Sequence, residues 1–156
     1  MPKRIPEFFV IDILISLDKV KRYTKNFLSL EEFVIDEKTF DATVRELEII
    51  GEALKHILSH SAYDYLVKHQ WRIIVDFRNI VAHEYFGIDY DEIFDIVRND
   101  LLEFEHEFLE FAQVVKSTEL ISALNFAKQE LTKIKRYESI NYLEYLESLL
   151  NDSNKD

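Results

Sequence analysis

The chain has no cysteine, only two glycines and only two prolines among its 156 residues. The absence of cysteine excludes disulfides, thiolate nucleophiles and zinc sites built on sulfur. Both prolines, Pro2 and Pro6, precede the first periodic apolar segment, so no later segment must break a helix at proline. Few runs alternate between apolar and polar residues. This composition, with an apolar fraction of 47%, predicts one all-α bundle with a substantial core.

A long apolar run and an excess of basic residues are also missing. The run from Phe8 to Ile11 is interrupted by Asp12, is too short to span a bilayer and has no small-residue cleavage site. We therefore expect a cytoplasmic protein without a membrane partner. The formal net charge of −11 argues against broad, charge-driven binding to nucleic acid. It leaves room for a small basic cleft on an acidic body, and it fits a partner with a basic face.

Apolar residues at helical spacing predict the order of elements along the chain. The first helix is apolar nearly all round in its first half, which indicates that it is either central or covered by a second subunit. Gly51, in the middle of a long helix, indicates close approach of another helix backbone. The predicted helices cover residues 7–27, 36 or 39 to 59, 70–85, 89 or 91 to 115, 117–136 and 140–150. A short helix is predicted to start at the capping box Ser29-Leu-Glu-Glu32, and residues 61–69 form a linker or a short helix.

The segment 76–87 combines Arg78, Asn79, His83 and Tyr85 on a predicted helix that otherwise suits a core. Arginine carries a permanent charge in a fork that fits phosphate, and histidine is the side chain best placed to move protons near neutral pH. A tyrosine hydroxyl can act as a nucleophile or accept a transferred group. Together these residue types predict chemistry on, or attachment of, a phosphate-bearing molecule.

Helical geometry constrains how these side chains act together. On a regular helix Arg78 and His83 point about 140° apart. They can meet if the helix ends or distorts near His83, as a glycine four residues later hints, or if a second subunit completes the site across a two-fold axis. An alternative interpretation is structural: Arg78 pairs with an acid such as Asp76 or Glu84, while His83 and Tyr85 border the core.

Two histidine pairings offer weaker candidates for a metal site. His56 and His60 lie four residues apart, a spacing that can hold a metal on one helix face, but no HExxH pattern accompanies them. The favoured interpretation is that their charge interacts with the C-terminal end of the helix. The sequence from Glu103 to His106 has the Glu-x-x-His spacing of di-iron bundles. No second copy occurs, so this stretch is interpreted as a solvated acidic face.

Charged and aromatic residues outside the motif are candidates for supporting roles only. Glu46, Glu48 and Glu52 lie on the long helix, and the like charges of Glu48 and Glu52 at i and i+4 call for partner cations such as Arg45 or Arg78. For the aromatic C-terminal segment, packing onto the bundle is favoured over a binding role, although a role in partner binding stays open. Its tyrosines are Tyr137, Tyr142 and Tyr145.

The segment Arg78-Asn79-Ile-Val-Ala-His83-Glu-Tyr85 resembles the RNxxxHxY motif of HEPN-domain toxins of the HepT (DUF86) family. The resemblance covers about residues 7 to 112, and the motif together with the upstream Ile-Ile-Gly-Glu-Ala segment makes it specific. We expect a HEPN domain over residues 7–115 and a C-terminal helical extension over 116–156, on which the resemblance is silent. The other matching segments are 11–14, 31–33, 41–42, 45–53, Trp71 and 88–89.

The resemblance implies an antiparallel HEPN-type bundle of four to six helices that dimerises, with two motif copies lining one cleft. It also implies a metal-independent endoribonuclease without a cofactor, in which a ribose 2′-hydroxyl attacks the adjacent phosphate of an RNA substrate. His83 would move protons. Arg78 would hold the phosphate and stabilise the transition state. Asn79 would orient the phosphate or His83.

The resemblance further implies the toxin half of a toxin–antitoxin pair. Its antitoxin would be an MntA-like minimal nucleotidyltransferase that silences the toxin by transferring AMP to Tyr85, and the two proteins could form a heteromer larger than the toxin homodimer. Each AMP adds negative charge and bulk, which would repel an RNA phosphate. An alternative is a non-catalytic HEPN module that binds substrate or nucleotide for a partner transferase. The presence of Arg78, His83 and Tyr85 favours the enzyme, whereas the net charge slightly favours the module.

Overall fold

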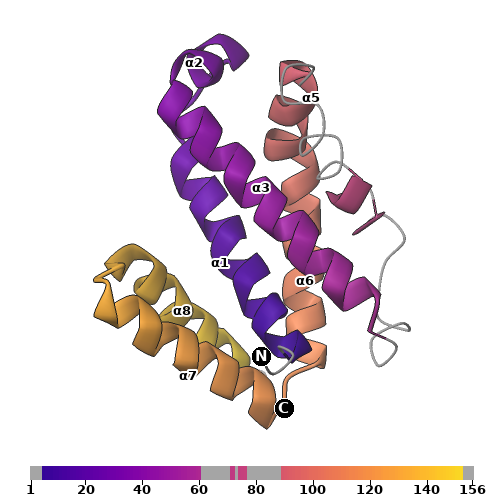
Figure 1. Ribbon diagram of the computed structural model, residues 1–156, viewed down its shortest axis with the longest axis vertical. Helices are drawn as coiled ribbons and strands as arrows, with labels where there is room; N and C mark the ends of the chain where they lie inside the picture. The colour runs from indigo at the N-terminus through magenta and orange to yellow at the C-terminus, as the bar shows by residue number, and fades with distance from the viewer. Residues whose placement is uncertain (1–4, 61–70, 73, 77–88, 153–156) are drawn as a thin grey trace.

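In the computed structural model, residues 5–60, 71–72, 74–76 and 89–152 are described, and every regular element in these ranges is helical (Figure 1). The predicted all-α bundle is therefore confirmed. The elements are α1 (Pro6–Thr24), α2 (Leu30–Ile35), α3 (Glu37–Leu58), α5 (Tyr90–Asp95), the π-helical segment η3 (Ile96–Asp100), α6 (Leu101–Val114), α7 (Thr118–Lys133) and α8 (Tyr137–Asp152).

Side-chain caps fix the starts of several helices where the sequence predicted them. The Ser29 hydroxyl accepts a hydrogen bond from the Glu32 N–H at 3.3 Å and opens α2. Asp36 opens α3 by accepting from the Thr39 N–H at 3.1 Å. Ser117 caps α7 in the same way. Each cap satisfies an N–H that has no partner within its own helix, so these starts are encoded locally.

Helix α1 is the centre of the bundle. It packs against α3, α6, α7 and α8 of its own chain. Val10, Ile13 and Leu14 have no exposed surface at all. Of the two predicted possibilities, a central helix is therefore the one observed, because elements of the same chain cover its apolar faces. No helix within the described ranges is long and apolar enough to cross a membrane.

Helices α7 and α8 form a hairpin that lies against α1, to its left in Figure 1. The hairpin shares one continuous core with the rest of the bundle. Two polar contacts tie the hairpin together and to the chain before it. The Lys116 ammonium donates to the Leu150 carbonyl at 2.5 Å, and Lys128 pairs with Glu147 at 3.0 Å. Its buried residues are Leu120, Ala123, Leu124, Leu143, Leu146 and Leu150.

The predicted helix from residue 89 or 91 to 115 is observed, but it is not α-helical throughout. Asp89 caps its first turn, and the segment η3 then interrupts the α-helical hydrogen bonding between α5 and α6. A π-helical turn rotates all following side chains relative to those before it. Around this turn the Arg98 guanidinium donates to the Phe27 carbonyl and lies 5.2 Å from the centre of the Phe94 ring. These tertiary contacts accompany a distortion that apolar spacing does not reveal.

Helix α7 ends at Lys133, earlier than the predicted limit near residue 136. Lys135 adopts a left-handed backbone with φ of 59°. The Arg136 N–H donates to the Leu131 carbonyl at 3.0 Å, and the Lys135 N–H donates to the Thr132 carbonyl at 3.2 Å. This is a Schellman ending with lysine where glycine is usual, so the sequence carried no stop signal. The early end lets α8 begin at Tyr137 rather than at the predicted Ile140.

Tyr142 is the aromatic residue of α8 that packs against the core, as the favoured interpretation of the C-terminal tyrosines predicted. Burial raises the pKa of the Tyr142 hydroxyl far above its usual value, and the nearby negative charges of Glu105 and Asp18, followed by Tyr145, raise the pKa further. The folded protein therefore holds this hydroxyl neutral. In the unfolded chain the Tyr142 hydroxyl ionises near pH 10. The stability that comes from keeping this hydroxyl neutral and buried is therefore complete below that pH and is lost as the pH rises above it.

We therefore expect Tyr142→Phe to flatten the alkaline end of the stability profile. The wild-type protein should lose free energy of unfolding as the pH rises above about 10, and the variant should lose less. Urea unfolding at pH 8 to 11 measures the difference. Tyr137→Phe is the matched control because Tyr137 is 60% exposed and is not among the groups that raise the pKa of Tyr142. Identical pH profiles for Tyr142→Phe and the wild type would contradict the assignment.

Candidate functional site

The predicted site residues Arg78, Asn79, His83 and Tyr85 lie outside the described residues, as does the end of the predicted helix 70–85. The structure describes the chain on both sides of this segment. The described surroundings of the motif are the two segments that flank it, the acidic face of α3 and a groove beside Asp89.

The N-terminal flank is held on α6 by the single tryptophan of the chain. Residues 71–72 and 74–76 are helical, as predicted, and Trp71 is 1% exposed. Its ring lies 5.6, 5.4 and 5.3 Å from the ring centres of Phe104, Phe108 and Phe111. The indole N–H donates to the Glu107 carboxylate at 2.9 Å. A large ring in a pocket of three aromatics, with its polar end satisfied, has one orientation, and this fixes the rotation of the helical segment.

That rotation is also seen in the residues that follow Trp71. Ile74, one helical turn further, is 5% exposed, whereas Asp76 is exposed. The buried side of this segment therefore faces α6, and its polar side faces solvent two residues before Arg78. The alternative pairing of Arg78 with Asp76 stays a prediction.

The C-terminal flank begins at Asp89, two residues after Gly87. The Asp89 carboxylate accepts a hydrogen bond from the Glu92 N–H at 3.2 Å and caps α5. Tyr90 follows with its ring 5.4 Å from that of Phe40 on α3. The cap and the ring contact hold the point at which the chain re-enters the described bundle. The described residues before the motif are thus held against α6, and those after it are held by α5 and α3.

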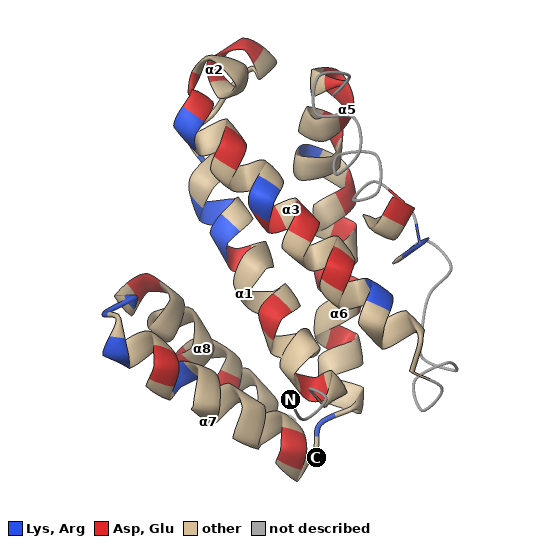
Figure 2. Cartoon of the chain, in the orientation of Figure 1, with Lys and Arg blue, Asp and Glu red and all other residues tan. Residues whose placement is uncertain are grey.

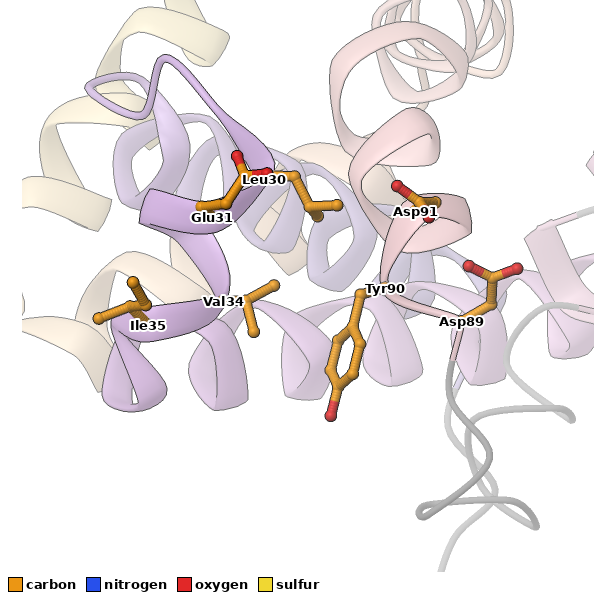
Figure 3. Close-up of a pocket in the computed structure, with 7 residues that line it drawn as sticks. All are labelled: Leu30, Glu31, Val34, Ile35, Asp89, Tyr90 and Asp91. Atoms are coloured by element: carbon orange, nitrogen blue, oxygen red, sulfur yellow. The ribbon is translucent and has the colours of Figure 1, made fainter.

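A groove of about 490 Å³ lies beside this return point, between α2 and α5. In Figure 3, Leu30 and Val34 of α2 face Tyr90 and Asp91 across the groove. The complete lining is Leu30, Glu31, Val34, Ile35, Asp89, Tyr90 and Asp91. Its charged residues are all carboxylates, which repel an anion. The groove is therefore unsuited to an RNA phosphate and suits an apolar or basic group.

The acids of α3 were expected to have cationic partners, and all three lie beside a positively charged group or a histidine in the described structure. Arg45 pairs with Glu48 at 3.3 Å, as one of the two predicted options had it. Glu52 lies 3.6 Å from the His56 Nε2. Arg78, the other predicted partner, is outside the described residues.

Glu46 is the acid of α3 for which no partner was predicted. It is 7% exposed, and Lys19 of α1 donates to its Oε1 at 3.4 Å. Its other oxygen, Oε2, is buried and accepts no hydrogen bond from any part of the chain that the structure describes. Neither the Lys19–Glu46 pair nor the Trp71–Glu107 hydrogen bond can be predicted from neighbouring residues, since the partners are 27 and 36 residues apart in the chain. A buried carboxylate with one unsatisfied oxygen is costly, and Lys19 offsets part of this cost.

The two weaker metal candidates have other partners. His56 stacks on Phe9 with the ring centres 4.4 Å apart, in addition to its contact with Glu52. His106 lies 3.3 Å from the carboxylate of Glu110, and both side chains are exposed. Within the described ranges, no group of three or more His, Asp or Glu residues is placed to hold a metal ion. These residues therefore form part of the exposed, charged surface of the bundle.

Comparison with known proteins identifies the family. A family model described as "Ribonuclease HepT-like" matches residues 13–115, and this range contains the complete motif 78–85. The chain belongs to the HepT-like ribonuclease family. The match runs from α1 to the end of α6, so the α7–α8 hairpin of this HepT-like chain lies beyond the matched range.

Curated relatives agree with this assignment. A "Putative RNase" of Methanocaldococcus jannaschii is 34% identical over 122 residues, which cover 76% of this chain and 94% of the relative. A second "Putative RNase" of that organism is 36% identical over 107 residues, covering 69% and 96%. The "Probable ribonuclease HepT" of Thermococcus cleftensis is 31% identical over 109 residues, covering 68% and 94%. No solved structure matches the HepT-like chain.

The anchoring role of Trp71 is testable by unfolding. Trp71→Ala should lower the free energy of unfolding by about 3–5 kcal/mol, because it removes three ring contacts and leaves a cavity on α6. Chemical denaturation measures this loss. Leu102→Ala on the same helix is the control, since Leu102 is 58% exposed and its removal should change stability by less than about 0.5 kcal/mol. A loss of less than about 1 kcal/mol for Trp71→Ala would show that the flank is not held this way.

Proposed function

We propose that this protein is a metal-independent endoribonuclease that acts as the toxin of a toxin–antitoxin pair. The observation that carries the proposal is membership of the HepT-like ribonuclease family over a range that includes Arg78, Asn79, His83 and Tyr85. The two anchored flanks support it. A catalytic segment needs fixed neighbours, and the aromatic pocket of Trp71 and the cap at Asp89 fix the described residues on either side of the motif.

In the proposed reaction, a ribose 2′-hydroxyl of RNA attacks the adjacent phosphorus. His83 accepts the hydroxyl proton as the new 2′-oxygen–phosphorus bond forms, and the bond from phosphorus to the 5′-oxygen of the next nucleotide breaks. The departing oxygen takes a proton from His83 or from water. The products are a 2′,3′-cyclic phosphate and a 5′-hydroxyl. Arg78 holds the phosphate and stabilises its added charge, and Asn79 orients the phosphate or the imidazole.

The proposal includes a homodimer in which the two motif copies line one cleft. On one regular helix Arg78 and His83 point about 140° apart, so a second motif copy is one way to bring the two groups to one phosphate. A distorted helix end near His83 is the other way, and the proposed chemistry is the same in both.

The proposal also includes silencing at Tyr85 by a minimal nucleotidyltransferase of the MntA type. The Tyr85 hydroxyl oxygen attacks the α-phosphorus of ATP, the α–β anhydride bond breaks, pyrophosphate leaves, and the phenolic proton passes to a base. The attached AMP places negative charge and bulk two residues from His83, where an RNA phosphate must bind. The acid-lined groove beside Asp89 fits a basic or apolar part of such a partner.

We expect His83→Ala and Arg78→Ala each to reduce RNA cleavage at least 100-fold, because each removes a group that acts only on the reacting atoms. Cleavage by the wild-type protein in excess EDTA, followed on labelled RNA by gel electrophoresis, measures the activity and its independence of metal. His106→Ala is the matched control because the His106 side chain is 78% exposed and lies beside Glu110 of its own helix. Full cleavage by a folded His83→Ala protein would overturn the assigned mechanism.

The silencing step has its own measurement. After incubation with the partner transferase and ATP, the intact mass should increase by one or more AMP groups, and RNA cleavage should fall in parallel. Tyr85→Phe should block the mass increase because it removes the accepting oxygen. Tyr145→Phe, on an exposed tyrosine of α8, should not block it. AMP gain that persists in Tyr85→Phe would exclude Tyr85 as the acceptor.

A further inference from the structure

Within the residues that the structure describes, cations of this strongly acidic chain gather around Arg22. Two cavities of about 380 and 270 Å³ adjoin at Arg22, which lines both, and together they are called here the basic groove. Their linings hold seven Lys and Arg side chains against the carboxylates of Asp18 and Glu138, a balance of +5 in a chain of net charge −11. Figure 2 shows Lys and Arg gathered on the upper half of α1 and at the turn between α7 and α8. The cations are Lys19, Lys21, Arg22, Lys25, Arg98, Lys135 and Arg136.

Several of these cations have their charge available to a ligand. Lys19 and Lys21 pair with acids of other helices, Glu46 and Glu105. Within the described part of the chain, by contrast, Lys25, Lys135 and Arg136 have no acidic partner. These three side chains are exposed and long, so they can close on an anion in the groove.

Arg22 lies at the junction of the two cavities and is held rigidly. Its Nε donates to Asp18 at 2.9 Å, and its Nη2 donates to the Ser139 hydroxyl at 3.2 Å. Its Nη1 donates to the Glu138 carboxylate at 2.6 Å, and that carboxylate is 79% exposed. An exposed carboxylate can swing into solvent at little cost. Glu138 therefore occupies the place that a phosphate oxygen would take on a guanidinium already oriented by two other bonds.

Aromatic side chains complete the groove. Tyr23 and Tyr137 line the cavity next to the α7–α8 turn, and Tyr137 is 60% exposed. Tyr23 is half-buried. Tyrosines that line a groove among Lys and Arg are typical of surfaces on which single-stranded nucleic acids stack their bases while the backbone follows the cations. An acidic peptide would use the charges but would leave the aromatic rings without partners.

We propose that the basic groove, which α1 forms with the α7–α8 hairpin on one side and with η3 and α6 on the other, binds the phosphate backbone of single-stranded RNA. The inference rests on the proposed action on RNA and adds to it a substrate-binding surface outside the motif residues. It gives the C-terminal extension a role: Lys135, Arg136 and Tyr137 come from the turn that only the extension supplies. The groove increases the affinity for RNA, while the motif residues perform the cleavage.

The test is RNA binding by the full chain carrying His83→Ala, so that the RNA stays intact. Fluorescence anisotropy with a labelled oligouridylate gives Kd as a function of salt. Adding Lys135→Asn and Arg136→Gln should weaken binding roughly 20-fold at about 0.1 M salt and reduce the slope of log K against log salt by about 1.4. Asparagine suits position 135 because it tolerates the left-handed backbone there. Lys38→Gln with Lys55→Gln, two exposed cations of α3 outside the groove, should have little effect.

A second variant tests the groove in the opposite direction. Glu138→Gln should tighten RNA binding several-fold, since it frees Arg22 from a competing charge. Glu144→Gln, an equal charge change at an exposed position on the same helix, should tighten binding much less. Equal effects of the two variants would assign the change to net charge alone and would overturn the role of Arg22.

The remaining outcomes separate this inference from the proposed function. RNA binding unchanged by Lys135→Asn with Arg136→Gln would overturn the inference even if the wild type cleaves RNA. Binding that depends on these two residues in a protein that never cleaves would support the groove and refute the chemistry. Polyglutamate bound as tightly as oligouridylate would overturn the choice of RNA and assign the groove to an acidic protein.

Discussion

The burial of α1 on all its apolar faces is the constraint on which the rest of the structure depends. A helix with apolar residues nearly all round must be covered everywhere, and α3, α6, α7 and α8 divide this task. Because α3 and α6 lie against the centre, the segment carried by Trp71 has a fixed aromatic pocket on α6. Because α7 and α8 cover a further side, their connecting turn meets the basic C-terminal half of α1. The packing around α1 therefore positions both the segment that precedes the motif and the basic groove.

The groove between α2 and α5 and the basic groove have opposite charge, so we expect them to bind different partners. The groove between α2 and α5, next to the return of the motif segment at Asp89, is lined by apolar side chains and carboxylates. The basic groove is lined by seven cations and two carboxylates. A net charge of −11 therefore conceals a separation of charge rather than an even distribution. We propose that a protein partner binds the acidic groove and, by the further inference, that RNA binds the basic one.

Local signals predicted the fold well, because they act within a few residues. Ser29, Asp36, Asp89 and Ser117 each cap the helix that follows, and each was readable from its type and position. The end of α7 was not readable, because Lys135 takes a left-handed conformation that glycine usually marks. The π-helical segment was not readable either, since apolar spacing does not report a single inserted turn. The first miss arises from a residue type that its conformation does not favour, and the second from a change in helical hydrogen bonding that leaves no mark in the apolar spacing.

By itself the sequence determined the all-α class, most helix starts, the motif at residues 78–85 and the resemblance that family comparison confirmed. Each of these depends on residues that are neighbours in the chain. Tertiary structure alone decided that α1 is central and that Glu46 meets Lys19. It also decided that Trp71 is held by α6 and that cations of α1 meet those after α7. These contacts join residues far apart in sequence, and packing, rather than any local pattern, determines which distant residues meet.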